Sequence, residues 1–470
     1  MTHVSVIWFR DDLRIADNPA LAAATKQGLP VVALYVLDEE SPGIRPLGGA
    51  AKWWLHESLV SLEHSLAGLG IPFVLRRGAA GYVVPELVRE TGATALFWNR
   101  RYGAGERAVD AELKSMLQTS GLQVESFQAS LLFEPWTIRT GKDTPYSVFT
   151  AFWRACSDKA GGVRPPLPVP FPISWPASQS DGGPAPAKLS EPLAAWALQP
   201  SNPDWADGLR QTWMPGEARA HGRLREFLET DLEAYIVGRD NPASQVTSGL
   251  SPHLRWGELS PHRIWHEVQR ARVQLSPRAA EGATKFLSEL GWREFAWHVL
   301  FHFPNLADAN WRQEFNVFPW RNPHPQELAA WQQGKTGYPL VDAGMRELWR
   351  TGTMHNRVRM VSASFLTKNL LIDWRVGEQW FWDTLVDADP ASNPFNWQWV
   401  AGSGVDAAPY FRVFNPELQA KKFDPQGTYV RRHIPEWGSG EYPAPILGLE
   451  ESRFAAIAAH QSVKQGGGQP

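Results

Sequence analysis

Strand-like and helix-like patterns alternate along the first 130 residues of this chain. Four short runs rich in Val, Ile, Leu and Phe are separated by amphipathic stretches that end on glycine, as helices often do. The runs are VSVIWFR (4–10), PVVALYVLD (30–38), IPFVLRRG (71–78) and TALFWNRR (94–101). Because parallel strands are joined by crossover helices, this alternation predicts a Rossmann-like α/β domain whose parallel sheet is covered on both faces.

The rest of the chain has a different composition. A proline-rich segment from Gly161 to Pro203 is typical of an extended connector. Beyond it, stretches such as GEARAHGRLREFLETDLEAYIVGRD and FLSELGWREFAWHVLFHF have the apolar spacing of helices. A length of 470 residues also exceeds what one hydrophobic core usually supports. We expect an α/β domain over 1–132, a linker over 133–204, an all-α domain over 205–462 and a disordered tail over 463–470.

Cysteine content, charge and hydropathy exclude several classes of protein. Cys156 is the only cysteine, so a disulfide framework and a Cys-rich metal site are excluded. The net charge of −3 does not advertise nucleic-acid binding for the chain as a whole, although a local basic face remains open. No run approaches 18 apolar residues, and the first residues carry charges where a signal peptide would be apolar. We therefore expect a cytoplasmic protein that is not bound to a membrane.

Tryptophan is concentrated in the second half, where 13 of the 24 indoles lie between Trp256 and Trp399. A large helical core is the plain explanation, since Trp buries much area. However, DADPASNPFNWQWV (387–400) mixes carboxylates, amides and indoles without a helical or strand alternation, and charges recur beside aromatics or hydroxyls in 239–261, 288–295 and 351–374. The Ser/Thr-rich segment 239–261 leads into a helix and could bind an anion. Together these segments predict a site for a large, planar, anionic ligand.

Glu294, His298 and His302 share one helical face at i, i+4 spacing and could ligate a metal. On a helix this rich in aromatic residues, histidines of the core or of a groove are the favoured interpretation. We therefore expect no metal site.

The segments considered together resemble the DNA photolyase and cryptochrome flavoproteins. The resemblance extends over nearly the whole chain through WFRDDLRIADNPAL, TSGLSPHLRWGELSP, ELGWREF, GKTGYPLVDAGMREL, MHNRVRM, DADPASNPFNWQWV, FRVFNP and KKFDP. It implies an N-terminal antenna domain, a long linker and an all-α C-terminal domain that binds FAD in a bent conformation. The strongest similarity is to the bacterial photolyases of cyclobutane pyrimidine dimers, while GYPLVDAGMRELW is also similar to plant cryptochromes.

The resemblance implies which residues bind FAD. Asp387 and Asp389 would approach the flavin and its adenosine part, paired with Arg359 and Arg293 so that neither carboxylate is buried alone. Asn393 would face flavin N5, where a neutral amide tolerates a reduced ring better than the Asp of plant cryptochromes. The residues implied to bind the cofactor are Tyr235, Thr247, Ser248, Gly249, Leu250, Ser251, Arg293, Arg359, Asp387, Asp389 and Asn393.

Two roles for the indoles also follow from the resemblance. Trp397 would lie nearest the flavin, with Trp374 and Trp320 continuing outward as a redox relay. Trp349, Trp380 and Trp382 could form a parallel branch. Trp399, two positions from Trp397, would face the opposite side of its helix, toward the substrate cavity.

The remaining implied residues would bind the lesion and the DNA backbone. Trp292 and Trp399 would stack on the flipped-out lesion, Glu289 and Asn356 would hydrogen-bond it, and Met360 would line the pocket. Arg357 and Lys421 would contact phosphates. The full expected set is Glu289, Trp292, Asn356, Arg357, Met360, Trp399 and Lys421.

In this family, excited reduced FAD passes an electron to a pyrimidine dimer, the ring splits and the electron returns. We therefore expect a deoxyribodipyrimidine photo-lyase that acts as a monomer on DNA containing cyclobutane dimers, with no obligate protein partner. The alternatives are a blue-light receptor of the cryptochrome type and a photolyase of the (6-4) photoproduct. The latter usually has a histidine pair at the MHNR position, whereas here Asn356 follows His355. A receptor would often have a long C-terminal extension.

The antenna chromophore is less constrained. Glu106 matches a position that contacts 5,10-methenyltetrahydrofolate in related enzymes, so this folate is the first expectation. Gly105 replaces the Asn expected beside it, which leaves a deazaflavin or no antenna open.

Overall fold

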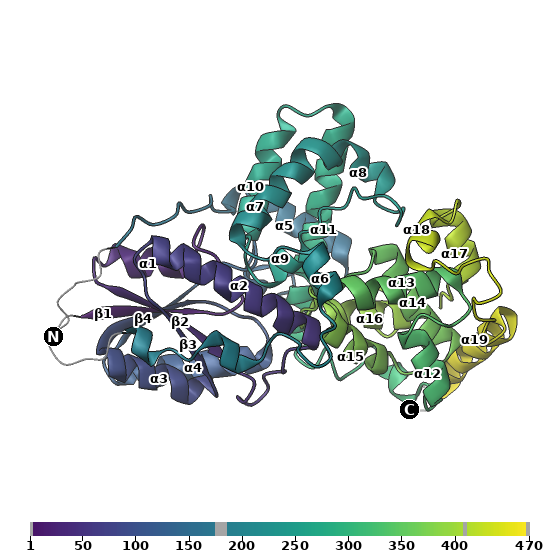
Figure 1. Ribbon diagram of the computed structural model, residues 1–470, viewed down its shortest axis with the longest axis horizontal. Coiled ribbons are helices and arrows are strands. Elements are labelled where there is room, and N and C mark those ends of the chain that lie inside the picture. The colour runs from purple at the N-terminus through teal and green to yellow at the C-terminus, as the bar shows by residue number, and fades with distance from the viewer. Residues whose placement is uncertain (1–2, 174–185, 408–410, 467–470) are drawn as a thin grey trace.

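The protein consists of an α/β part and a larger helical part (Figure 1). The structure is a computed structural model that describes residues 3–173, 186–407 and 411–466. No helix in these ranges is long and apolar enough to cross a membrane.

A five-stranded parallel sheet forms the core of the α/β part. Its order is β3-β2-β1-β4-β5. The strands are β1 (Val4–Phe9), β2 (Val31–Leu37), β3 (Phe73–Arg77), β4 (Ala93–Asn99) and β5 (Gln123–Phe127). The predicted runs thus form four of the five strands, and the short fifth strand lies beyond them.

Helices cover both faces of the sheet, as the near-continuous apolar strands predicted. α1 (Pro19–Lys26) and α2 (Gly49–Gly68) pack on the face that includes Ile7 and Phe9. α3 (Ala80–Thr91) and α4 (Ala104–Thr119) pack on the face that includes Val6 and Trp8 (Figure 1). Successive residues of β1 therefore face opposite layers, because side chains alternate along a strand.

The strand order reverses between β1 and β4, which lie side by side at the centre of the sheet. Asp11 follows β1, and Arg100, Arg101 and Tyr102 follow β4. In open α/β sheets, ligands bind beyond the carboxyl ends of the strands at such a switch point. The fold therefore directs attention to these residues.

The predicted linker is partly folded and follows the edge of the sheet. α5 (Phe149–Asp158) lies within it and packs on the helical part. Farther along, the Glu191 N–H donates to the Leu75 carbonyl of edge strand β3 at 2.8 Å, and Ser190 Oγ accepts from the Leu75 N–H at 3.0 Å. Residues 174–185 of the expected connector lie outside the described ranges.

The second half is helical, as predicted. Its helices are α6 (Asp207–Thr212), α7 (Glu217–Glu226), α8 (Leu232–Gly238), α9 (Ser251–Arg255), α10 (Pro261–Arg272), α11 (Pro277–His302), α12 (Pro325–Gln332), α13 (Pro339–Thr351), α14 (Asn356–Ser364), α15 (Trp374–Thr384), α16 (Ser392–Ala401), α17 (Pro416–Phe423), α18 (Thr428–His433) and α19 (Leu449–Gly466). α19 thus continues past residue 462, where we expected a tail to begin, and 467–470 lie outside the described residues.

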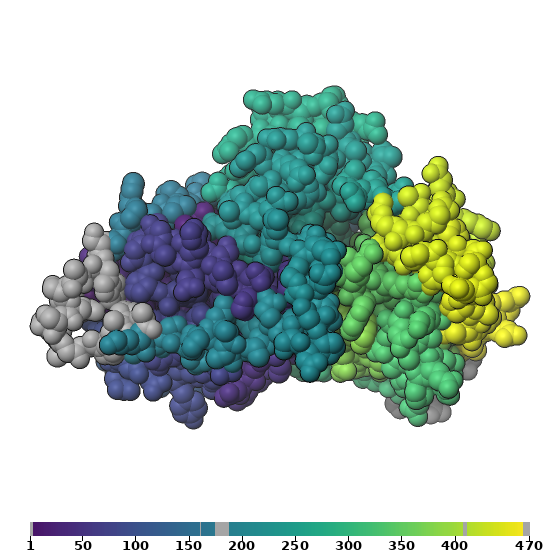
Figure 2. Space-filling view, viewed as in Figure 1, coloured from purple at the N-terminus to yellow at the C-terminus, as the bar shows by residue number. Residues whose placement is uncertain are grey.

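Two apolar clusters divide these helices. One joins α7, α8, α10 and α11, and the other centres on α13 to α16. In Figure 2, a notch separates the lobe that contains α8 from the part formed by α17 and α18. An ion pair bridges the two sides, because Arg357 of α14 pairs with Asp240, which follows α8, and also covers the ring of Phe423 in α17.

Candidate functional site

The expected pairing of Asp387 with Arg359 is present in the structure. Arg359 Nη2 lies 3.2 and 3.0 Å from the two oxygens of Asp387, and Ser251 Oγ donates to the same carboxylate at 2.7 Å. Only 6% of the Asp387 side chain is exposed. These contacts bring three distant segments of the sequence together and hold a paired carboxylate at the centre of the helical part.

The Ser/Thr-rich loop before α9 is fixed by an arginine that we did not predict. Arg223 of α7 donates to the carbonyl oxygens of Thr247 and Ser248, each at 2.8 Å, and pairs with Asp231. The chain then turns at Gly249, whose φ is +63°. Because Arg223 occupies the carbonyls, the loop can present its N–H and hydroxyl groups elsewhere, which suits an anionic ligand.

Asp389 has a local role that explains part of the polar stretch 387–400. Its Oδ1 accepts from the N–H groups of Ala391 and Ser392 at 2.8 and 2.5 Å, so it caps the start of α16. We expected Arg293 to pair with the aspartates of this stretch. Instead, Arg293 donates to the Ser130 carbonyl at 2.8 Å, because α11 places it beside the end of the α/β part.

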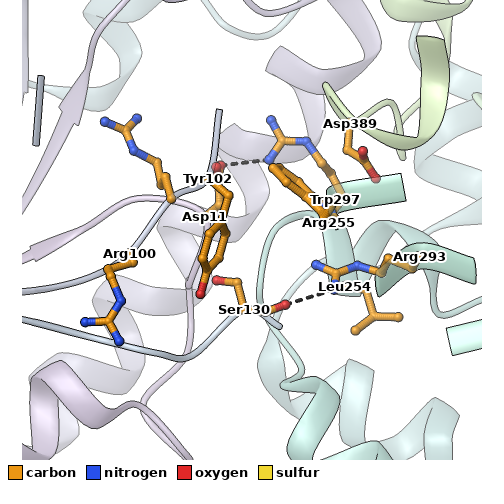
Figure 3. Close-up of a pocket in the computed structure, with 10 residues that line it drawn as sticks. Asp11, Arg100, Tyr102, Ser130, Leu254, Arg255, Arg293, Trp297 and Asp389 are labelled. Carbon is orange, nitrogen blue, oxygen red and sulfur yellow. Dashed lines mark hydrogen bonds and ion pairs between the residues drawn. The ribbon is translucent and has the colours of Figure 1, made fainter. Parts of the chain in front are cut away.

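An interdomain pocket joins this site to the switch point of the sheet. Figure 3 shows Asp11 and Tyr102 opposite Arg255, Arg293 and Asp389. The full lining is Asp11, Arg100, Arg101, Tyr102, Ser130, Leu254, Arg255, Arg293, Trp297 and Asp389. The cavity is small, about 20 Å³, and its four arginines are paired with Asp11, Asp110, Glu134 and the Ser130 carbonyl.

One interdomain ion pair spans this pocket. Arg255 Nη1 lies 2.7 Å from Asp11 Oδ1, and Arg255 Nε donates to the Ala388 carbonyl at 2.9 Å. Burial opposes ionisation of Asp11, but the positive charges of Arg255 and Arg101 outweigh it and lower its pKa. Burial raises the pKa of Tyr102, so this phenol stays protonated.

Glu294, next to Arg293 on α11, is buried and has an unusual pKa. Burial raises this pKa to about 7, although the nearby Arg293 and the N–H groups of Leu132 and Phe133 favour the charged form. Near neutral pH the carboxyl therefore exchanges a proton, and the charge around Arg293 depends on pH.

The side-chain amide of Asn393 is held from one side. Its Nδ2 donates to the carbonyl and to Oε1 of Glu378, at 3.0 and 2.8 Å. Both partners are acceptors, so the nitrogen must face Glu378 and the oxygen Oδ1 must point the other way.

The relay indoles belong to one apolar cluster. Trp374 and Trp397 are buried in it, and Trp320 packs against it. Trp374 Nε1 donates to Asn310 Oδ1 at 2.9 Å, while Trp397 meets Phe381 edge to face. Trp399 also packs against this cluster, and its Nε1 donates to the Asp406 carbonyl at 3.0 Å.

Two indoles of the expected parallel branch are stacked. The rings of Trp349 and Trp380 are 6.0 Å apart and inclined by 8°. Trp349 is 55% exposed, so this pair reaches solvent. Trp382 instead packs under the guanidinium of Arg45, from the α/β part.

The structure pairs the charges that we expected to meet the lesion and the DNA. Glu289 lies 2.7 Å from Arg239 and 2.8 Å from Lys285. Nε and Nη2 of Arg357 donate to the two oxygens of Asp240, each at 2.9 Å, so its charge is partly compensated.

The other residues that we expected to contact the lesion or the DNA lie as follows. Trp292 stacks on Phe149 with ring centroids 3.7 Å apart. Asn356 contacts the sulfur of Met360 at 4.0 Å. Lys421 lies in the last turn of α17.

Of the two histidines on the same helical face as Glu294, His298 is buried and His302 is half-buried. The Tyr146 N–H donates to His298 Nε2 at 3.1 Å, and burial lowers the pKa of His298 to about 4. His302 stacks edge to face on His298, with ring centroids 4.7 Å apart. In the described part of the chain, no group of three or more His, Cys, Asp or Glu side chains could hold a metal ion.

The presence of Gly105, in place of the Asn expected beside Glu106, has a steric cause. A Cβ atom at this position would lie 2.3 Å from the Gly43 carbonyl oxygen, so an Asn there would clash with the loop after β2. Glu106 lies in the first turn of α4 and is not among the residues lining the interdomain pocket.

Sequence reasoning missed four residues that organise this region: Arg223, Arg239, Arg255 and Glu378. Arg255 lies in a segment whose polar character was noted, and Glu378 lies between Trp374 and Trp380. The partners of both residues, Asp11 and Arg45, are far away in sequence. Arg239 and Arg255 both stand in the stretch 239–261 that we had already singled out.

The architecture defines a class of two-part protein, in which a parallel α/β sheet is joined to a larger helical part that contains the paired Asp387. The family model for DNA photolyase matches residues 5–172, and that for the FAD binding domain of DNA photolyase matches residues 286–441. The deoxyribodipyrimidine photo-lyase of Agrobacterium fabrum is 46% identical, with 98% of each chain covered. Cryptochrome-1 of Arabidopsis thaliana is 35% identical over 98% of this chain and 70% of its own length.

A solved structure agrees with these sequences. The bacterial class III photolyase from Agrobacterium tumefaciens superposes with a TM-score of 0.92 at 45% identity, covering 99% of this chain and 98% of that chain. The chain therefore belongs to the DNA photolyase and cryptochrome family. The predicted family, the two-part fold class and the FAD-binding domain are confirmed.

Proposed function

We propose that this protein uses light to repair cyclobutane pyrimidine dimers in DNA, with FAD as its catalytic cofactor. The predicted enzyme class, deoxyribodipyrimidine photo-lyase, agrees with the names of its bacterial relatives. The observation that carries the proposal is the amide of Asn393, a neutral group that Glu378 holds with its oxygen pointing away.

The residues present fit FAD. Ser251, Asp387 and Arg359 form a hydrogen-bonded set that offers both a hydroxyl group and a paired charge, and Arg293 lies on the wall of the adjoining pocket. These side chains would hold the anionic and polar parts of the cofactor, while the buried indoles Trp397 and Trp374 border it. When bound in its reduced form, FAD supplies the electron that splits the dimer.

The protein must bring the lesion out of the duplex before the reaction. Flipping costs a few kcal/mol, and less for a damaged and poorly stacked base. Stacking on Trp292 and Trp399 would return roughly 1–3 kcal/mol per base. Because these amounts are comparable, phosphate contacts must supply much of the net affinity. Arg357 would be one such contact once DNA competes with Asp240 for its guanidinium.

The surroundings of His355 argue against the (6-4) photoproduct as substrate. Its Nε2 lies 2.9 Å from the Arg239 carbonyl, and its Nδ1 accepts from the Arg357 N–H at the start of α14. Burial lowers the pKa of this imidazole to about 4, so it is neutral near pH 7. A neutral ring whose Nε2–H is donated to a carbonyl and whose Nδ1 accepts a backbone N–H is poorly suited to acid catalysis on a lesion.

A cryptochrome-type receptor is the second candidate, because the Arabidopsis relative aligns over nearly the whole chain. Asn393 favours repair, since the plant cryptochromes that the sequence resembles typically have Asp at this position. The two candidates differ in a measurable activity.

For the antenna, 5,10-methenyltetrahydrofolate is the first candidate, with a deazaflavin or no antenna as the alternatives. The pocket at the switch point, with a volume of about 20 Å³, is too small for either chromophore. A folate or a deazaflavin would add its own near-ultraviolet or blue band to the flavin spectrum of the purified protein.

The test of the proposed function is repair by the purified, photoreduced protein under blue light. Thymine dimers in single- and double-stranded oligonucleotides should be restored, and (6-4) photoproducts should persist. Repair of (6-4) photoproducts with dimers untouched would reverse the assignment, and bound FAD without any repair would favour the receptor.

A further inference from the structure

A loop of the α/β part reaches the helix that holds Asn393 in place. Arg45, between β2 and α2, makes a two-pronged contact with Glu378 of α15, with N–O distances of 2.7 and 2.9 Å. The residues around it tighten the contact. The Trp382 indole donates to the Pro46 carbonyl at 2.9 Å, and a Cβ at Gly48 would lie 2.2 Å from the Trp382 carbonyl oxygen.

Glu378 connects this loop to the site. Its side chain is 3% exposed, and the oxygen that accepts from Arg45 Nη1 also accepts from Asn393 Nδ2. A buried carboxylate is costly unless it is paired, and a planar guanidinium fixes both of its oxygens in one plane. Arg45 therefore decides where the acceptor for the Asn393 amide lies.

Arg45 is itself restrained. Its guanidinium lies 4.0 Å from the centroid of the Trp382 ring, and 32% of its side chain is exposed. Stacking on the indole and bonding to Glu378 leave the guanidinium one favourable orientation. A residue of the N-terminal part is thereby coupled to an amide in the helical part.

We propose that Arg45 is a positioning residue that, through Glu378, keeps Oδ1 of Asn393 directed toward the flavin and so favours the reduced, N5-protonated cofactor. The inference rests on the proposed function, because it takes Asn393 to face flavin N5. An oxygen in that direction can accept a hydrogen bond from a protonated N5, whereas an amide free to rotate would also offer its NH₂ group.

The test is the midpoint potential of bound FAD, measured by absorbance against a reference dye in the holoenzyme. Arg45→Met keeps an apolar stem on Trp382 but removes every donor to Glu378. We expect the ratio of reduced to oxidised flavin at a fixed potential to fall about tenfold, the worth of one hydrogen bond, or ~30 mV for a two-electron couple. Arg45→Lys, with one point charge in place of the fork, should give a smaller shift.

Lys52→Met is the matched control, because Lys52 is 33% exposed and pairs with Glu39 within the α/β part. It should leave the potential unchanged. The Arg45→Met shift should also vanish when Asn393 is already Ala, since the effect passes through that amide.

Two results would overturn the inference. One is an unshifted potential in Arg45→Met and Arg45→Lys proteins that retain FAD. The other is a shift that persists undiminished in the Asn393→Ala background, because the charge would then act without the amide. A wild-type protein that takes up no FAD would instead refute the proposed function itself, so the two failures are distinguishable.

Discussion

Replacing Glu294 with Gln should change how the stability of the protein depends on pH. The carboxyl of Glu294 is 2% exposed, and burial raises its pKa from 4.5 to about 7. In the unfolded chain it loses its proton near pH 4.5, whereas in the folded protein it keeps the proton until about pH 7. Between these values the folded state binds more protons, so the free energy of unfolding falls as pH rises.

The size of this effect follows from the shift. One pKa unit corresponds to 1.36 kcal/mol, so a shift from 4.5 to about 7 makes wild type lose about 3 kcal/mol once the pH is above 7. About 2–3 kcal/mol of this loss falls between pH 5 and 8. Gln keeps a carbonyl oxygen for the N–H groups of Leu132 and Phe133 but has no proton to lose in this range.

The assay is urea unfolding at pH 5 and pH 8, followed by tryptophan fluorescence. The stability of Glu294→Gln relative to wild type should rise by about 2–3 kcal/mol between the two values. The exposed Glu281, on the same helix, provides the control, and Glu281→Gln should retain the wild-type pH dependence. If Glu294→Gln and wild type differ by the same amount at pH 5 and pH 8, the buried carboxyl is not protonated in the folded protein and the reasoning fails.

Three further predictions concern the proposed function. Trp374→Phe should abolish photoreduction of oxidised FAD by an external reductant yet leave repair by chemically prereduced enzyme near normal. Trp399→Ala should leave photoreduction intact and weaken lesion binding by roughly 1–3 kcal/mol. Equal loss of the same activity in both would show that the indoles are only core. Asp387→Ala, which leaves Arg359 unpaired, should lower the FAD content of purified protein, and unchanged content would contradict its role. Asp240→Asn should free the guanidinium of Arg357. DNA binding should then tighten, and the fall of the DNA affinity with salt should steepen by up to about one phosphate contact. An unchanged salt slope would count against a contact between Arg357 and phosphate.

The fold could be predicted because its signals are local. The stretch AAKWWLHESLVSLEHSLAGLG has helical spacing and a terminal glycine, and α2 runs from Gly49 to Gly68 within it. The pairing of Asp387 with Arg359 was also accessible, because both lie in recognisable motifs. The bond between Arg45 and Glu378 was not, since no pattern in either segment points to a partner in the other domain.

Charge pairing was the part of the site that sequence reasoning judged least well. Arg357 was expected to be free for phosphate, and its partner Asp240 lies in a segment that was considered only for its hydroxyl groups. Arg293 was assigned to the aspartates because both occur in motifs, whereas the geometry of α11 directs it to the Ser130 carbonyl. Composition indicates which charges are present, but only the packing of helices determines which of them meet.

The contact of the linker with β3 has a consequence for self-association. A strand at the edge of a sheet presents unpaired N–H and C=O groups that can template pairing with another molecule. Here the Leu75 N–H and carbonyl are satisfied by Ser190 and Glu191, so that part of the edge is capped by the chain itself. A protease cut that released this segment would expose the backbone N–H and C=O groups of Leu75 on edge strand β3, and the nicked protein should then aggregate.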